Sequence, residues 1–207
     1  MQELLTGFGL ATAAGLNAYI PMLFLGLLSR FTDLVTLPAG WSWLENGWVL
    51  TIVGVLLAVE VVADKIPALD SVNDTIQTFV RPTAGGIVFA SGTTAQTAAV
   101  TDPGEFAQSG KWIPVAMGVV VALIVHLTKT AVRPAANVAT AGVAAPVLST
   151  IEDATSVGLV FVSILIPALV LVVVIAMAWA VIALLRRRRR KKRTPPDQSG
   201  PDRGGRA

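Results

Sequence analysis

The sequence predicts an all-α membrane protein, folded as a bundle of about six hydrophobic segments of which some are broken or re-entrant. Of the 207 residues, 54% are hydrophobic and 14% are charged, whereas roughly 25% of the residues in a typical soluble domain are charged. The mean hydropathy is +0.69, and several uncharged stretches approach the roughly 20 residues that a membrane-spanning helix needs. A soluble domain of this size could not bury so much apolar surface, so lipid must form part of its surroundings.

Six stretches of the chain are candidate membrane segments. They cover residues 4–28, 48–66, 79–100, 112–131, 132–150 and 157–185. The last of them should tilt, or kink at Pro167, because it is longer than a bilayer is thick. The third and fifth are rich in Gly, Ala, Ser and Thr, which let helices approach closely. Each of these two is therefore either a full span or a re-entrant piece.

Residues 1–185 form the predicted transmembrane domain, and residues 186–207 form a basic, disordered tail. Every residue from Arg186 to Arg193 is basic, which predicts a cytoplasmic C-terminus in the plasma membrane. Six crossings then put the N-terminus in the cytoplasm as well, on the same side as Lys65. The basic run should attract anionic lipid at about 1 kcal/mol per residue. Acidic residues outnumber basic ones in residues 1–185, so the high pI does not indicate a nucleic-acid partner.

Ionisable residues gather near the ends of two apolar segments and in the chain that follows the first of these. Their spacings of three, four and seven place them on shared helix faces. The set comprises Glu60, Asp64, Lys65, Asp70, Asp74, Arg81, His126, Lys129 and Arg133. Because buried charges are costly unless they are paired, we expect the acidic and basic faces to meet in a polar pocket or ion path. The alternative is that the charges lie at the lipid headgroups, reach water there and hold helices together.

Within this set, Glu60 is the strongest candidate for binding an ion, because it lies deepest from its helix end. Asp64 and His126 are candidate proton carriers, the latter because imidazole titrates near neutrality. A single His excludes a multi-His metal centre, and no catalytic motif is present. The sequence therefore predicts no cofactor and leaves metal binding open. Glu152 and Asp153 are expected in a solvated external loop.

The first segment carries a predicted helix break at Gly15, Asn17 and Pro21, since Gly and Pro both weaken a helix. Asn17 stands among apolar residues and needs a hydrogen-bond partner. A broken helix frees backbone carbonyls that can bind an ion or substrate. The alternative is a packing kink in which Asn17 bonds a neighbouring helix.

Two Arg-Pro pairs occur in similar surroundings. Residues 78–84 and 130–136 share Thr, Val, Arg, Pro and a final Ala in register. This similarity predicts an internal repeat, either parallel or inverted, as occurs in transporters. Proline is tolerated in the first turn of a helix, so Arg81-Pro82 and Arg133-Pro134 should begin their segments, with each arginine near the interface. There the arginines could hold phosphate headgroups or an anionic substrate.

Five motifs together resemble a known family of bacterial membrane proteins. They are Gly15-Leu-Asn-Ala-Tyr-Ile-Pro21, Glu60-Val-Val-Ala-Asp-Lys-Ile-Pro67, Phe79-Val-Arg-Pro-Thr-Ala-Gly85, His126-Leu-Thr-Lys129 and Ser149-Thr-Ile-Glu-Asp153. In this order they resemble domain-of-unknown-function family 4126, over about residues 4–170. The resemblance implies a multi-pass membrane protein and implies no activity.

These observations favour a small transporter or channel-like protein. A proton or small cation would interact with Glu60, Asp64 and Asp74, while the basic residues of the set balance the charge. A second hypothesis is a non-transporting scaffold whose small-residue faces bind another membrane protein or a second copy. A third is an enzyme acting on lipid or lipid-linked phosphate near the cytoplasmic headgroups, which would use Asp70, Asp74, Arg81 and Arg133.

Overall fold

The fold is all-α, as predicted, throughout the part of the chain that the structure describes. The structure is a computed structural model, and it describes residues 1–93, 110–140 and 143–191. The chain divides into two compact units, residues 1–172 and 173–207. Most of the predicted basic tail, from residue 192 on, lies outside the described residues.

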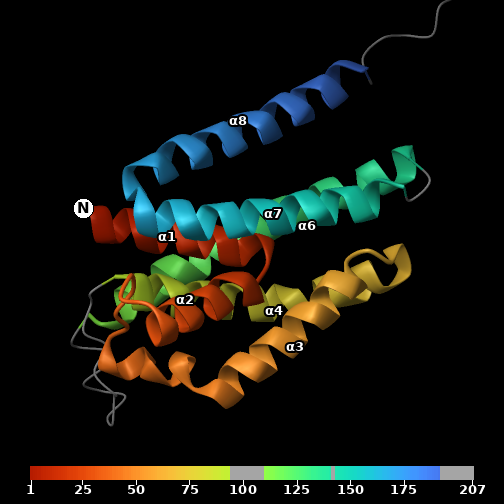
Figure 1. The fold of residues 1–207 in the computed structure, drawn as a ribbon. Helices are drawn as coiled ribbons and strands as arrows, with labels where there is room; N and C mark the ends of the chain where they lie inside the picture. The colour runs from red at the N-terminus through yellow and green to blue at the C-terminus, as the bar shows by residue number, and fades with distance from the viewer. Residues whose placement is uncertain (94–109, 141–142, 192–207) are drawn as a thin grey trace, which may run out of the picture. The chain divides into compact units, whose positions relative to one another are not determined.

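Eight helical elements make up the described chain (Figure 1). They are α1 (Gln2–Leu16), α2 (Tyr19–Phe31), the 3-10 helix η1 (Ala39–Glu45), α3 (Gly47–Ala63), α4 (Pro67–Gly92), α6 (Trp112–Ala139), α7 (Ala144–Leu165) and α8 (Pro167–Lys191). Capping side chains and prolines determine where several of these helices begin. The side chain of Asn46 accepts a hydrogen bond from the backbone of Trp48 and so caps α3, which contributes about 1 kcal/mol. Pro67 and Pro167 each stand at the first position of a helix, where a missing N–H costs nothing.

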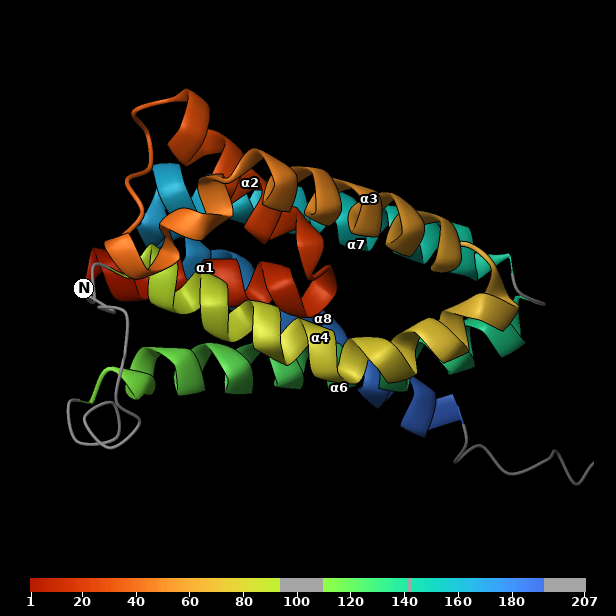
Figure 2. The ribbon, with the colours of Figure 1, turned by 90° about the horizontal axis from the view of Figure 1, so that it is seen from below.

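Helices α1 and α2 form a hairpin instead of one membrane crossing. The predicted break lies at Asn17, whose backbone is extended. Figures 1 and 2 both show α1 leading away from the N-terminus and α2 returning toward the same end of the molecule. At 1.5 Å per residue the two helices are about 22 and 20 Å long, short of a bilayer core of roughly 30 Å. The expectation of a single span over residues 4–28 is therefore wrong.

The hairpin also changes where the N-terminus lies. Helices α3 and α6 run from the end that holds the N-terminus to the opposite end, and α4 and α7 return (Figure 2). The N-terminus and Lys65 consequently lie at opposite ends of the first unit. Counting residues 4–28 as one crossing wrongly predicts the same side for both.

Fewer helices are long and apolar enough to cross a membrane than the six predicted. Two described helices qualify, α6 over Trp112–Pro134 and α7, and a third qualifies if η1 and α3 form one span bent by 64°. Residues 132–150 are no separate segment, because α6 continues through Pro134 to Ala139 and α7 begins at Ala144. Residues 157–185 are likewise divided at Ile166, between α7 and α8.

Helices α4 and α6 lie side by side and antiparallel (Figure 2), and glycines bring their backbones together. A Cβ atom at Gly118 would lie 2.2 Å from the carbonyl oxygen of Gly85, and one at Gly85 would lie 2.7 Å from the carbonyl oxygen of Gly118. Only a residue without a side chain permits this approach. Gly85, one of the small residues predicted to pack helices closely, is thus used within the chain.

The α4–α6 contact makes a testable prediction. We expect Gly118→Ala to lower the stability of the detergent-solubilised protein by about 1–3 kcal/mol, because the added methyl group overpacks the contact. The matched control is Gly54→Ala, since a Cβ at Gly54 meets nothing within 4 Å and the change should stabilise the helix by at most about 1 kcal/mol. Thermal unfolding in mild detergent measures both. Equal midpoints for the two variants would contradict the close approach.

The hairpin makes a second prediction, which the absence of cysteine from the sequence makes easy to test. Single cysteines would replace the exposed residues Glu3, Ser42 and Val143. In sealed vesicles, we expect a membrane-impermeant maleimide to reach Glu3→Cys and Ser42→Cys from one side and Val143→Cys from the other. Labelling of Glu3→Cys and Val143→Cys from the same side would rule the hairpin out.

Candidate functional site

Among the residues that the structure describes, a charge-balanced network of six ionisable side chains lies between helices α3, α4, α6 and α7. Its three carboxylates and three cations are Glu60, Asp64, Glu152, Arg81, Lys129 and Arg133. Five of the six residues are buried, and the side chain of Glu152 is 16% exposed. Equal numbers of opposite charges are what an apolar interior requires, because an unpaired charge there would be strongly destabilising.

Asp64, at the C-terminal end of α3, is the hub of this network. Its Oδ2 atom lies 3.0 Å from Lys129 Nζ, 3.3 Å from Arg133 Nη2 and 3.6 Å from Arg81 Nη2. Its other oxygen accepts a hydrogen bond of 2.7 Å from the amide of Asn73. Three cations from two helices therefore share one carboxylate, so Asp64 holds α4 and α6 against the end of α3.

Glu60 lies one helical turn before Asp64 and has far fewer partners. It is 1% exposed, and its Oε1 atom accepts a hydrogen bond of 2.8 Å from Arg81 Nη2. Its Oε2 atom has no hydrogen-bond partner among the described residues, and neither has the Nε atom of Arg81. Arg81 and Glu60 therefore make one hydrogen bond and not the two of a bidentate arginine–carboxylate pair.

Glu152 and Asp153 belong to the charged site, which corrects their expected place in a solvated loop. Both lie within α7, and Glu152 pairs with Lys129 at 3.0 Å and with Arg133. Asp153 lies 4.0 Å from Lys65, whose side chain is 37% exposed at the rim of the site. The signal in the sequence was the position of the two acids inside the apolar stretch 144–165.

The two Arg-Pro pairs lie inside helices. The prediction that they begin their segments is therefore wrong. Pro82 is within α4 and Pro134 is within α6. Both preceding arginines are buried, and their guanidinium groups reach Asp64 from the two helices. Pairing with carboxylates inside the bundle therefore outweighs the preference of proline for the first helical turn.

His126 occupies a defined place beside Arg81. The Nδ1 atom of its ring lies 3.2 Å from Arg81 Nη1, and because a guanidinium group can only donate, Nδ1 must accept. The proton then resides on Nε2, which lies 3.0 Å from the hydroxyl oxygen of Thr78. The hydroxyl in turn donates to the backbone carbonyl of Asp74. In this arrangement His126 is neutral and orients Arg81.

Asn17, at the tip of the α1–α2 hairpin, bonds Asp153, which is the neighbour of the network residue Glu152 in α7. Its amide donates a hydrogen bond of 2.9 Å to Asp153, while its oxygen accepts from the backbone N–H groups of Tyr19 and Ile20 and so caps α2. Lys129 also donates to the carbonyl of Leu16, the last residue of α1, over 3.2 Å. The carbonyl freed by the break therefore binds a cation of the protein itself.

The other residues singled out in the sequence have varied positions. Gly15 packs against α6, where a Cβ would lie 2.7 Å from the carbonyl oxygen of Ala122, and Pro21 is buried in α2. Asp74 is half-buried on α4, with one carboxylate oxygen that makes no hydrogen bond to a described residue. Asp70 is also on α4, but its side chain lies outside the described part of the structure.

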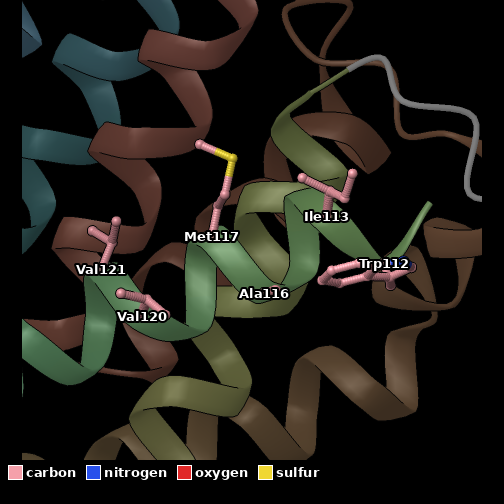
Figure 3. Close-up of a pocket in the computed structure, with 6 residues that line it drawn as sticks. All are labelled: Trp112, Ile113, Ala116, Met117, Val120 and Val121. Atoms are coloured by element: carbon pink, nitrogen blue, oxygen red, sulfur yellow. The ribbon is translucent and has the colours of Figure 1, made fainter. Parts of the chain in front are cut away.

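The structure also contains a hollow of about 390 Å³ on the first half of α6. Figure 3 shows the side chains that line it, which are Trp112, Ile113, Ala116, Met117, Val120 and Val121. All are apolar, apart from the indole N–H of Trp112, so the hollow is unsuited to an ion. No group of three His, Asp or Glu residues with the arrangement of a metal site occurs among the described residues.

The network predicts a specific pattern of stability. We expect Asp64→Asn to destabilise the protein by about 3–5 kcal/mol, because it leaves buried cations without their shared counter-ion. Adding Lys129→Met restores the balance of charge and should recover part of the loss. The control is Asp33→Asn, at an exposed residue outside the network. Thermal unfolding in one detergent compares the wild type, the two single variants and the double variant. A double variant less stable than Asp64→Asn alone would contradict the pairing of Asp64 with Lys129.

Comparisons with known proteins agree with the arrangement of the motifs. A family model described as a domain of unknown function (DUF4126) matches residues 4–187. No curated protein and no solved structure matches the chain. Because the match covers nearly all of the described helices, from the hairpin through the charged network to α8, the chain belongs to the DUF4126 family.

Proposed function

We propose that the protein is a small multi-pass transporter or channel-like protein of the plasma membrane, in which Glu60 binds a proton or a small cation. The apolar helices support the membrane location. The charged network supports a transport role, because ionisable groups inside a membrane bundle are rare and mark substrate and ion pathways.

The single observation that carries the proposal is the state of Glu60. It is buried, makes one hydrogen bond to Arg81 and keeps one oxygen without a partner among the described residues. An acid of this kind can exchange an ion without dismantling the bundle. Asp64, in contrast, has three cations and Asn73 as partners, so releasing it would cost several contacts at once. We therefore assign a structural role to Asp64, which keeps the helices in contact, and ion binding to Glu60.

The proposed orientation follows from the basic residues. The run from Arg186 to Arg193 favours a cytoplasmic C-terminus and contact of the tail with anionic lipid. Lys65, at the junction of α3 and α4, favours the cytoplasm for its end of the first unit. The hairpin then puts the N-terminus on the other side of the membrane.

Two alternatives have less support. A scaffold that uses its small-residue faces to bind a partner would need those faces free, but Gly85 and Gly118 pack against each other. An enzyme on lipid phosphate would need accessible arginines, but Arg81 and Arg133 are buried and paired with carboxylates.

Ion flux in proteoliposomes tests the proposal. We expect Glu60→Gln to reduce the flux at least tenfold while the protein still folds, because the substitution keeps the shape of the side chain and removes the ionisable group. The matched control is Glu3→Gln, which makes the same chemical change at an exposed residue of α1. Equal flux in wild type and Glu60→Gln, or none in either across protons and alkali cations, would overturn the proposal.

A further inference from the structure

We propose that the ion bound at Glu60 is a proton, delivered through a water-sized site formed by Tyr19, Glu60, Gln77 and Arg81. This inference rests on the function proposed above and deepens it by choosing between a proton and a metal cation. The four side chains come from α2, α3 and α4, and they meet beside the tip of the α1–α2 hairpin.

The site is defined by buried polar atoms that lack partners among the described residues. They are Glu60 Oε2, Gln77 Oε1 and Arg81 Nε, and each residue is at most 2% exposed. Arg81 Nη2 holds Glu60 Oε1 at 2.8 Å, so the two free atoms of this pair flank a bond that is already made. Gln77 is one turn before Arg81 on the same face of α4, and its side chain lies near that of Tyr19.

The types of these atoms decide which species fits. Two are acceptors and one is a cationic donor, so a single occupant in contact with all three would donate two hydrogen bonds and accept one. Water meets that requirement. A sodium or potassium ion does not, because it has no hydrogen to donate to the two acceptors. The glutamate and the arginine also cancel in charge, which leaves no excess negative field to hold a metal cation.

The proton balance of the step is simple. The water in the site gives one proton to Glu60 Oε2, so that one of its O–H bonds breaks and a new O–H bond forms at Oε2. A hydronium ion in contact with that water supplies the replacement proton, and two water molecules remain. Arg81 keeps a counter-ion in Asp64, 3.6 Å away. When Oε2 returns the proton to a water molecule, the O–H bond breaks, hydronium forms, and the carboxylate and its pair with Arg81 are restored. The charged and titratable groups that face Glu60 throughout are Tyr19, Asp64, Arg81 and Lys129, with His126 behind Arg81.

The test measures proton and alkali-cation flux separately in proteoliposomes, with a pH-sensitive dye and with sodium- or potassium-sensitive dyes. We expect proton flux in the wild type, at least a tenfold loss in Glu60→Gln, and partial losses in Gln77→Leu and Tyr19→Phe. Gln2→Leu is the matched control, because Gln2 is exposed. Glu60→Asp, which keeps a carboxyl group, should retain part of the flux if the site folds.

The outcomes separate this inference from the function on which it rests. Sodium or potassium flux without proton flux would overturn the proton assignment and leave the transport proposal standing. Flux of no ion would overturn both. As a readout independent of transport, infrared titration of the protein in lipid should show a protonated carboxyl band that disappears in Glu60→Gln. Proton flux that Gln77→Leu and Tyr19→Phe leave unchanged would overturn the role of the water-sized site.

Discussion

The structure depends on the requirement that every charge inside an apolar helix bundle be neutralised where it stands. In the described part of the chain, three carboxylates and three cations satisfy it by converging from four helices. Because the pairs are shared and not separate, removing one member leaves others uncompensated. The network therefore sets the relative positions of α3, α4, α6 and α7 more strictly than contacts between aliphatic side chains, which adapt to small shifts.

The hairpin of α1 and α2 depends on the same network. Asn17 ends one helix, caps the next and donates to Asp153, while the carbonyl of Leu16 accepts from Lys129. A break in a membrane segment is tolerated only where the freed backbone groups find partners within the protein, and the charged site provides them. Close packing of Gly85 against Gly118 in turn brings α4 and α6 near enough for Arg81 and Arg133 to share Asp64.

The sequence predicted the helical class, the break near Asn17 and most of the residues of the charged site, because helical spacing puts Glu60 with Asp64, and Lys129 with Arg133, on common faces. It missed what depends on tertiary contacts. Hydropathy cannot distinguish a crossing from a hairpin, so the number of segments was wrong. The relation between the two Arg-Pro segments stays a prediction, although α4 and α6 are antiparallel.

The central claim is that Asp64 and Lys129 are paired inside the bundle in a bilayer. Solid-state NMR of protein labelled at lysine Nζ and at the aspartate carboxyl carbon measures the dipolar coupling between such groups directly. The account predicts a strong coupling that is lost in Lys129→Met and that persists in Lys111→Met, at a lysine outside the network. A spectrum unchanged by Lys129→Met would contradict it.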